Sequence, residues 1–357
     1  MKYAKLEDCC EILDSKRIPV TANKRRNGKY PYYGANGLQD YVDDYIFDDE
    51  LVLLAEDGGN FNSKEKPIAY RVSGKCWVNN HAHVLKPKQG INVDYLCYAL
   101  MYYDVSGLVN GATRQKLTQA TMRKMKIPVL SEIDQLKIVE IIGSIQDLKD
   151  NYCSILCKAD ELVKARFVEM FGDPVNNDKE WIRDSVERLC KEIYGGGTPS
   201  KSHPEYYEDG EIPWITSKDM KTDILIDSQI HINEDGVSNS TARIVPKNSV
   251  IMVIRSGILK HTLPVAINAV PITVNQDLKV FIPGNRIVTN FLAYQFKMME
   301  REILSGVRAV TADNIEFDAL KRRELIVPPI ELQQQFADFV QQVDKSKYDD
   351  IRVEYKC

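Results

Sequence analysis

The sequence predicts an α+β protein with two similar globular domains, separated by two long helices packed as an antiparallel coiled coil. Three observations lead to this prediction. A long central stretch carries a heptad pattern, the sequence before it reappears in order after it, and each copy mixes short strands, Gly/Asn/Pro turns and a helix. Such a mixed order is typical of α+β domains and differs from the regular alternation of a βαβ array.

The central helix is expected over residues 131–173, which end in a Gly/Pro stop. Its apolar residues alternate in steps of three and four without a break, at Ile138, Ile141, Ile145, Leu148, Tyr152, Ile155, Ala159 and Leu162. This heptad seam indicates a partner helix. An amphipathic helix on the core of one domain would show a similar period, and it is the duplication of the flanking sequence that favours a coiled coil.

The first globular domain is expected over residues 1–130. Leu51–Ala55 has the continuous apolar character of a buried strand, and Glu56–Gly59 turns the chain. A second strand is expected over Val78–Leu85, where a proline soon follows, and a helix is expected near Val93–Tyr103.

The same plan restarts after a Gly-Asp-Pro stop, and residues 174–328 form the second expected domain. One match between the copies would be chance, but six matches in order predict an internal duplication. The segments Cys190–Ile193, Ile212–Ile215, Val250–Ile254, Val274–Pro283, Thr311–Arg323 and Ile326–Gln333 repeat Cys10–Ile12, Tyr30–Tyr33, Leu51–Ala55, Val78–Pro87, Thr113–Met125 and Pro128–Gln135.

A distal helix is expected over residues 329–357, shorter and weaker than the central one. Counted from the glutamine that the copies share, its apolar pattern fades after Val343 into Ser346 and Asp350. Three explanations stay open: the coil is short on that side, it is completed by another chain, or it is the product of a truncated or recombined gene. The seam residues expected to join the two helices are Ile138, Ile141, Ile145, Leu148, Ile155, Leu162, Phe336, Phe339 and Val343.

Composition restricts the class of protein. The chain has 357 residues, 44% hydrophobic and 27% charged, as in a soluble globular protein with two domains. Its start shows no secretory signal, its apolar runs are too short to span a bilayer, and its eight cysteines suit a reducing cytosol. We therefore expect a cytoplasmic protein without a membrane partner. Because the net charge is −4, DNA binding would require local basic patches.

The sequence contains no recognisable catalytic or metal motif, and we expect neither kind of site. It lacks a P-loop, a G-x-S-x-G elbow and an H-E-x-x-H motif. Gly195–Ser200 is rich in glycine without the G-x-G-x-x-G spacing, which favours a flexible turn over a phosphate-binding loop. His81 and His83 would share one face of the expected strand, without further ligands at zinc spacing.

Basic side chains recur at matching places in the two copies. In the first copy they adjoin Tyr30–Tyr33, and in the second they follow Trp214 and flank a turn at Gly257. One such patch alone is more often solvated surface, but the recurrence favours DNA, whose phosphates and base edges are contacted by Lys, Arg, Asn and Gln. The candidate DNA-binding residues are Lys24, Arg25, Arg26, Lys29, Tyr32, Lys201, Lys218, Arg255 and Lys260.

Three stretches and the Pro/Gln-led starts of both helices resemble the specificity (S) subunit of type I restriction-modification systems. These stretches are Gly196–Ser200, Ile212–Lys218 and Val327–Gln333, and the resemblance extends over essentially the whole chain. It implies two target recognition domains, each reading one half of a bipartite, asymmetric DNA site. The helices would form a spacer whose length sets the gap between the half-sites.

The resemblance also implies partners and cofactors. The S subunit is non-catalytic, and it binds double-stranded DNA and two methyltransferase (M) subunits, which use S-adenosylmethionine to methylate adenine at N6. Motor-nuclease (R) subunits join the assembly and use ATP and Mg²⁺ to cleave DNA. No cofactor is expected on this chain. The short distal helix departs from the family pattern, which concerns assembly more than fold.

Two other functions stay open from the sequence. A stand-alone enzyme with a duplicated α+β fold, such as a hydrolase, would act without a partner, and the lack of a recognisable nucleophile or metal set argues against it. A coiled-coil adaptor would bind proteins and no DNA. The sequence specifies neither the bases read, nor the side chains that contact them, nor the oligomeric state without partners.

Overall fold

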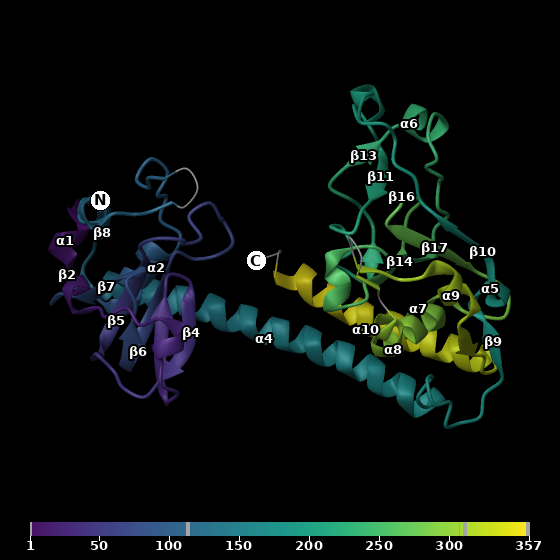
Figure 1. Ribbon diagram of the computed structural model, residues 1–357, viewed down its shortest axis with the longest axis horizontal. Coiled ribbons are helices and arrows are strands. Elements are labelled where there is room, and N and C mark those ends of the chain that lie inside the picture. Colours follow the sequence, from purple (N-terminus) through teal and green to yellow (C-terminus); the bar gives the residue numbers. More distant parts are fainter. Residues whose placement is uncertain (1, 112–114, 307, 310–312, 355–357) are drawn as a thin grey trace. The chain divides into compact units, whose positions relative to one another are not determined.

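The computed structural model describes residues 2–111, 115–306, 308–309 and 313–354 (Figure 1). The chain divides into two compact units, Met1–Tyr152 and Cys153–Cys357, and each has its own sheets and core. Helix α4 (Glu132–Phe171, 40 residues) contributes residues to both units. Within the described residues, no helix is long and apolar enough to cross a membrane. Two threonines of one predicted sequence repeat, Thr113 and Thr311, lie outside the described residues.

The first unit is built on one main sheet with the strand order β2-β7-β5-β6-β3-β4. Strand β5 lies between β7 and β6 and is antiparallel to both, whereas β3 runs parallel to β6. A separate antiparallel pair, β1 with β8, joins the two ends of the unit. The elements are β1 Lys2–Lys5, α1 Leu6–Cys9, β2 Cys10–Ile12, β3 Tyr30–Gly34, β4 Gly37–Val42, β5 Phe47–Ala55, β6 Ala69–Val78, β7 Ala82–Pro87, α2 Val93–Met101, α3 Gln119–Met122 and β8 Lys126–Val129.

Strand β5 is apolar throughout its second half because both faces of the sheet are covered. Val52 and Leu54 belong to the core that includes helix α2, whereas Leu51 and Leu53 belong to a second core on the opposite face. Successive strand residues point to opposite faces, so a strand covered on both sides needs a continuous apolar run. The buried strand predicted at Leu51–Ala55 is thus confirmed.

Helix α2 confirms the helix predicted near Val93–Tyr103. Its N-terminus is fixed by Asn92, whose side-chain oxygen accepts hydrogen bonds from the backbone N–H groups of Asp94 (2.9 Å) and Tyr95 (3.0 Å). Such an N-cap satisfies backbone donors that have no partner inside the helix.

The single strand predicted over Val78–Leu85 is wrong. Strand β6 ends at Val78, a turn follows, and β7 begins at Ala82. The Asn79 side chain accepts a hydrogen bond from the N–H of His81 at 2.8 Å and so fixes this turn. A period-two pattern does not distinguish one strand from two strand ends joined by polar residues. His81 therefore lies outside the strand and does not share a strand face with His83.

The second unit repeats the centre of this sheet, in the order β10-β17-β14-β15-β12, beside a smaller sheet β13-β11-β16. The smaller pairs are β20 with β9 and β18 with β19. The elements are β9 Arg183–Ser185, α5 Val186–Leu189, β10 Cys190–Gly195, β11 Ile212–Ile215, β12 Ile224–Leu225, β13 His231–Ile232, α6 Glu234–Ser238, β14 Val250–Val253, β15 Val265–Asn268, β16 Thr273–Val274, β17 Leu278–Pro283, α7 Thr289–Met298, α8 Glu300–Ser305, β18 Arg308–Ala309, β19 Asp313–Asn314, α9 Phe317–Arg322, β20 Glu324–Ile326 and α10 Ile330–Glu354.

The two units share strand register as well as strand order. Leu53 pairs with Val84 in the first unit, and Ile251 pairs with Val280 at the equivalent place in the second. The parallel pair β3–β6 likewise corresponds to β11–β16, although the long strand β6 is represented in the second unit by two shorter strands, β15 and β16. The predicted fold class, two similar α+β domains, is confirmed.

Each long helix begins beside a buried glutamine that ties it to its own unit. Gln135 accepts a hydrogen bond from the N–H of Asn92 (2.8 Å) and donates one to the carbonyl of Gly90 (2.8 Å). Gln333 accepts one from the N–H of Val288 at 2.9 Å. Both glutamine side chains are fully buried, so these bonds satisfy polar groups that water cannot reach.

The C-terminal end of α4 packs against α10 through aromatic rings. Phe167 and Phe171 lie 5.4 and 5.7 Å from Phe336, measured between ring centroids. Earlier on α4, the Arg166 guanidinium lies 5.9 Å from the ring of Phe339, further along α10. The two helices therefore run antiparallel in this part of the second unit (Figure 1).

A coiled coil along the predicted seam is not confirmed. The α4 residues that face the core of the second unit are Val163, Phe167 and Phe171. Phe336 of α10 is also buried, and Phe339 and Val343 pack at the edge of the same core. The α4 seam residues Ile141, Ile145, Leu148, Ile155 and Leu162 are 53–59% exposed, and Ile138 is half-buried. Their pairing with another helix stays a prediction.

Candidate nucleic-acid interface

The first predicted basic patch contains one aromatic residue that belongs to the interior. Tyr32 is only 1% exposed, and its hydroxyl donates a hydrogen bond to the Val20 carbonyl at 3.2 Å. The Arg25 guanidinium lies 4.2 Å above its ring and is paired with Asp40 at 3.2 Å. The prediction of Tyr32 as a DNA contact is therefore wrong, because alternation in β3 points its ring inward. Arg25 is engaged mainly in holding this part of the sheet.

The other cations of this patch lie at the surface. Lys24 and Lys29 are exposed, and the side chain of Arg26 is 85% exposed, 4.0 Å from Asp43. An ion pair this exposed contributes about 0–1 kcal/mol, so Arg26 can exchange it for a phosphate at little cost. Beside these residues is a hollow of about 260 Å³, lined by Val20, Lys24, Arg25, Arg26, Val42, Asp43, Asp44 and Trp77.

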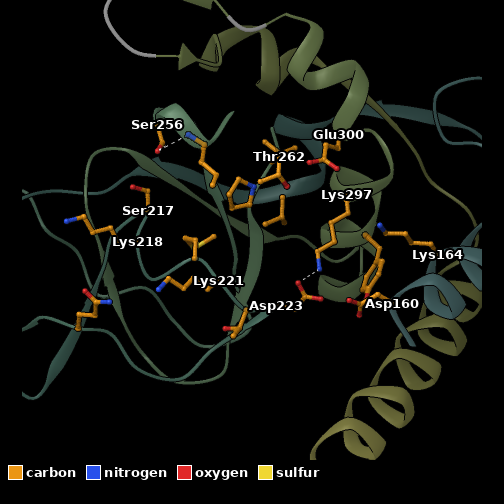
Figure 2. Close-up of a pocket in the computed structure, with 18 residues that line it drawn as sticks. Asp160, Lys164, Ser217, Lys218, Lys221, Asp223, Ser256, Thr262, Lys297 and Glu300 are labelled. Atoms are coloured by element: carbon orange, nitrogen blue, oxygen red, sulfur yellow. Dashed lines mark hydrogen bonds and ion pairs between the residues drawn. The ribbon is translucent and has the colours of Figure 1, made fainter. Parts of the chain in front are cut away.

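The second unit has a larger cavity of about 810 Å³, shown in Figure 2. It lies between the loop after β11, the turn after β14 and helices α4, α7 and α8. Predicted Lys218 lies on one side of it with Lys221, and Lys164 of α4 lies on the other side. The lining residues are Asp160, Lys164, Ser217, Lys218, Met220, Lys221, Thr222, Asp223, Gln229, Ser256, Ile258, Thr262, Leu263, Pro264, Val265, Tyr294, Lys297 and Glu300.

Two of the cavity's acidic side chains are already bound to other groups of the protein. Asp223 pairs with Lys297 at 2.6 Å, and Glu300 accepts a hydrogen bond from the N–H of Leu263 at 2.6 Å. Burial raises the pKa of the Tyr294 phenol far above its ordinary value, so it stays neutral.

The cavity rim also carries lysines that are not engaged in this way. Lys164, Lys218 and Lys221 are exposed and make no ion pair with any described residue. The positive charge of these lysines would therefore attract a phosphate backbone to the rim. Sequence reasoning missed Lys164, because it lies on the helix interpreted as a spacer, and Lys221, which is three positions beyond Lys218.

The loop that carries Lys218 is held by one carboxylate. Asp219 accepts hydrogen bonds from the N–H (2.8 Å) and the hydroxyl (2.7 Å) of Thr216, and from the N–H of Gln229 at 3.1 Å. Aspartate commonly closes turns in this way. The loop therefore presents Lys218 from a fixed backbone.

The remaining predicted residues of the second unit lie outside the lining of this cavity. Lys201 and Lys260 are exposed, the latter at the end of the 3₁₀ turn η4 (Gly257–Lys260). Arg255 is 49% exposed and pairs with Asp277, its Nε lying 2.6 Å from the carboxylate. Of the predicted residues in this unit, the structure places only Lys218 in the cavity wall.

The predicted Gly-rich loop is constrained by packing. A Cβ on Gly196 would lie 1.9 Å from the Val274 carbonyl oxygen, and a Cβ on Gly197 would lie 2.3 Å from the backbone carbon of Thr241. Only glycine permits this close approach of backbones, so these two positions need no ligand to explain their residue type.

The turns after the central strands carry equivalent acid–base pairs in which the acidic and basic residues have exchanged positions. In the first unit Asp57 approaches Nδ1 of His81 at 2.5 Å. In the second unit Arg255 and Asp277 occupy the same two positions. The backbone shows this, because the N–H of Asp57 donates to the carbonyl of His81, and the N–H of Arg255 donates to the carbonyl of Asp277. The frame is therefore repeated, while the acidic and basic partners have exchanged places.

A buried polar cluster lies behind this turn in the first unit. Asp14, Glu56 and His83 bring ligand atoms within 4.8 Å of one another, a spacing that could hold a cation. Glu56 is paired with Arg17 (2.6 Å) and Lys116 (2.9 Å), however, so its charge is already balanced. These contacts outweigh the opposing effect of burial and lower the pKa of Glu56. The cluster fits an internal salt-bridge network better than a metal centre.

The fold and the site define a class of protein: a duplicated α+β chain with a separate cationic surface on each of its two units and a long helix after each repeat. The chain belongs to the family described as "Type I restriction modification DNA specificity domain", which matches residues 1–151 and 186–352. The family membership predicted from sequence is confirmed.

Curated relatives agree with this assignment. The chain is 35% identical over 307 residues to the type I restriction enzyme EcoR124I/EcoR124II specificity subunit of Escherichia coli, covering 84% of this chain and 72% of the relative. It is 26% identical over 345 residues to the putative type I restriction enzyme specificity subunit S.HindORF215P of Haemophilus influenzae, covering 93% and 85%.

Solved structures show the same fold. The S subunit of a type I restriction-modification system from M. genitalium superposes with a TM-score of 0.62 at 12% identity, covering 99% of this chain and 91% of that one. A chain from a structural study of type I complex assembly and conformational transition gives a TM-score of 0.52 at 12% identity, covering 99% and 93%.

Proposed function

We propose that this chain is the non-catalytic DNA sequence-recognition subunit of a type I restriction-modification complex. Each unit reads one half of a bipartite, asymmetric site, and the long helices set the spacing. The observation that carries this proposal is the duplicated frame with different surface charges, seen in the pairs Asp57–His81 and Arg255–Asp277. Two readers that share a backbone but differ at their turns suit two half-sites of different sequence.

The partners follow from the same proposal. Two methyltransferase subunits bind the helices and methylate adenine at N6 with S-adenosylmethionine, and motor-nuclease subunits use ATP and Mg²⁺ for cleavage. The exposed apolar residues of α4 support a protein partner on the helices, because a contiguous exposed apolar stripe is typical of an interaction surface. This chain carries no cofactor of its own, and its location is the cytoplasm, where its DNA substrate is found.

The test begins with the site itself. Cells that express this chain with its methyltransferase partners are expected to carry N6-methyladenine at a split motif with a fixed gap, read by methylome sequencing. The purified complex should then bind a duplex containing that motif, with an affinity that falls steeply with salt. A complex that methylates nothing and shifts no duplex would support the adaptor function instead, and turnover of a substrate by this chain alone would support an enzyme.

A further inference from the structure

One position of the duplicated sheet has opposite electrostatic surroundings in the two units. In the second unit, Lys279 of β17 lies directly across from Gly195 of β10. In the first unit, the register of β2 against β7, continued by two residues, places Asp14 across from His83. There Nδ1 of His83 lies 2.6 Å from the Asp14 carboxylate. Asp14 is thus the internal hydrogen-bonding partner at this position.

The polar side chains that surround this position in the first unit have no polar counterparts in the second. The carboxylate of Asp14 is replaced by Gly195. Both units share a backbone hydrogen bond, donated by the N–H of Leu117 in the first unit and of Ile315 in the second. Two residues further along, Gln119, which donates to Asp14 at 2.8 Å, is replaced by Phe317. Glu56 is replaced by Ile254, because the backbone carbonyls of these two residues accept the equivalent hydrogen bonds in the two units.

Lys279 is nevertheless held in a defined place. Its Nζ lies 4.5 Å from the centroid of the Phe317 ring, and Nζ of Lys321 lies 4.4 Å from the same ring. A Cβ built on Gly195 would be 2.4 Å from Nζ of Lys279, so the ammonium group occupies the space that a side chain would fill. Both ammonium groups therefore lie against the ring of Phe317, and the absence of a side chain at Gly195 leaves room for that of Lys279.

This arrangement leaves positive charge without an internal partner. Lys279 is half-buried, and among the described residues no carboxylate pairs with it. Burial, and then the charges of Lys321 and Arg255, lower its pKa, which indicates a local positive potential. The nearby acids are used elsewhere: Asp277 pairs with Arg255 and Asp318 with Lys321. A desolvated ammonium group of this kind is stabilised by an anion from outside the protein.

We propose that Lys279, which shares the ring of Phe317 with Lys321, binds a backbone phosphate of the DNA half-site read by the second unit. The proposal rests on the function proposed above and adds a site that the first unit lacks. A phosphodiester carries a permanent negative charge and unprotonated acceptor oxygens, which match the donors of the Lys279 ammonium group. The contact positions the duplex and reads no base, because phosphate is the same in every sequence.

The experiment uses the complex of this chain with its methyltransferase subunits and a duplex containing its site. Dissociation constants are measured by fluorescence anisotropy over a series of salt concentrations. Lys279→Met is expected to weaken binding about tenfold and to reduce the slope of log affinity against log salt by about 0.9. Lys279→Arg should bind within about twofold of the parent chain.

Two further variants separate a phosphate contact from a structural role. Gly195→Asp places a carboxylate beside Lys279, as in the first unit, and should weaken binding as Lys279→Met does although the lysine is retained. Lys247→Met is the matched control, an exposed lysine of the same unit, and should leave binding unchanged. Lys279→Met should unfold at the same temperature as the parent chain or higher, since it removes an unpaired half-buried charge; a lower value would indicate a structural lysine and overturn the proposal.

Modified DNA identifies the phosphate. One neutral methylphosphonate in the half-site should weaken binding by the parent complex and have no effect on Lys279→Met. If no position behaves in this way, or if Lys279→Met keeps the parent affinity and salt slope, the phosphate site is wrong while DNA recognition stands. If the parent complex binds no duplex, the proposed function fails and the phosphate site fails with it.

Discussion

At the scale of single residues, the two buried glutamines show how the long helices are attached. Gln333 donates hydrogen bonds to the carbonyls of Pro328 (2.8 Å) and Arg286 (3.2 Å) and accepts one from the N–H of Val288 (2.9 Å). It therefore connects the start of α10 to the segment before α7. The shared glutamine was visible in the sequence as a fixed point of the repeat, but its role depends on loops that only the fold brings together.

Replacing Gln333 should be costly. Gln333→Ala leaves buried backbone groups without partners, and we expect a loss of about 3 kcal/mol in the free energy of unfolding. The neighbouring Gln334→Ala is the control, because Gln334 is exposed. Urea denaturation of the purified chain measures both variants, and a loss from Gln333→Ala no larger than that from Gln334→Ala would contradict this role.

The buried Asp14 predicts a pH dependence of stability. Burial opposes its ionisation, but hydrogen bonds with His83, Val84 and Gln119 outweigh it, so its pKa is lowered from the ordinary value of 3.8. A carboxyl group with a lower pKa in the folded state stabilises the fold above its unfolded pKa, and this stabilisation is lost as the pH falls through the folded pKa.

We therefore expect Asp14→Asn to cost about 1–3 kcal/mol at pH 7 and less at pH 3, measured by urea denaturation at each pH. Asp150→Asn, at an exposed position on α4, is the control. A difference between Asp14→Asn and the parent chain that grows on acidification would refute the assigned role.

The residue-level prediction for Tyr32 failed for a definite physical reason. Tyr32 and Arg25 have the composition of a nucleic-acid patch, yet the ring is buried and the guanidinium covers it. The sequence shows which residues are neighbours along the chain, but it does not show which face of a strand each residue occupies. Lys218 is exposed in the loop after a strand end, as a DNA contact requires, and its binding of DNA stays a prediction.

At the scale of elements, helix α4 carries two apolar stripes that differ by about one residue in phase. Val163 and Phe167 lie in the core of the second unit, whereas Leu162 and Ile155 are more than half exposed. The outer stripe repeats in steps of three and four, and the inner one, Val163, Phe167 and Phe171, in steps of four, so a helical period fits both stripes. The sequence therefore predicted the helix and its length correctly, but it could not decide which stripe its own chain covers.

The two stripes should respond differently to substitution. The pair Ile141→Ser and Ile145→Ser should change the stability of the isolated chain by no more than about 0.5 kcal/mol, because both side chains are exposed. The same pair should weaken binding of methyltransferase subunits, measured by sedimentation of the mixed proteins. Phe167→Ala, in contrast, should cost the isolated chain about 4 kcal/mol. Equal destabilisation by both changes would mean that the outer stripe is covered within this chain.

At the scale of the whole molecule, the duplication predicts two readers that fail separately. Lys218→Ala in the second unit and Arg26→Ala in the first should each weaken binding of the full site about three- to tenfold by removing a phosphate contact. In duplexes with one half-site scrambled, each variant should lose affinity only where its own half-site is intact. Anisotropy with the two scrambled duplexes measures this, and equal losses on both would show that the units do not bind independently.

The turn pairs have a further consequence for how such a protein changes its target. Asp57 and Arg255 occupy one position of a common frame, and their partners His81 and Asp277 occupy another. All four side chains are partly exposed to water. A variant in which only one partner of the pair has changed therefore loses about 1 kcal/mol or less of its free energy of unfolding. Two mutations of small energetic cost can thus exchange the acidic and basic side chains of the turn. The strand that precedes the turn is buried on both faces and stays under separate selection. If the proposed function holds, the charge that such a turn presents to DNA can change without a period of instability.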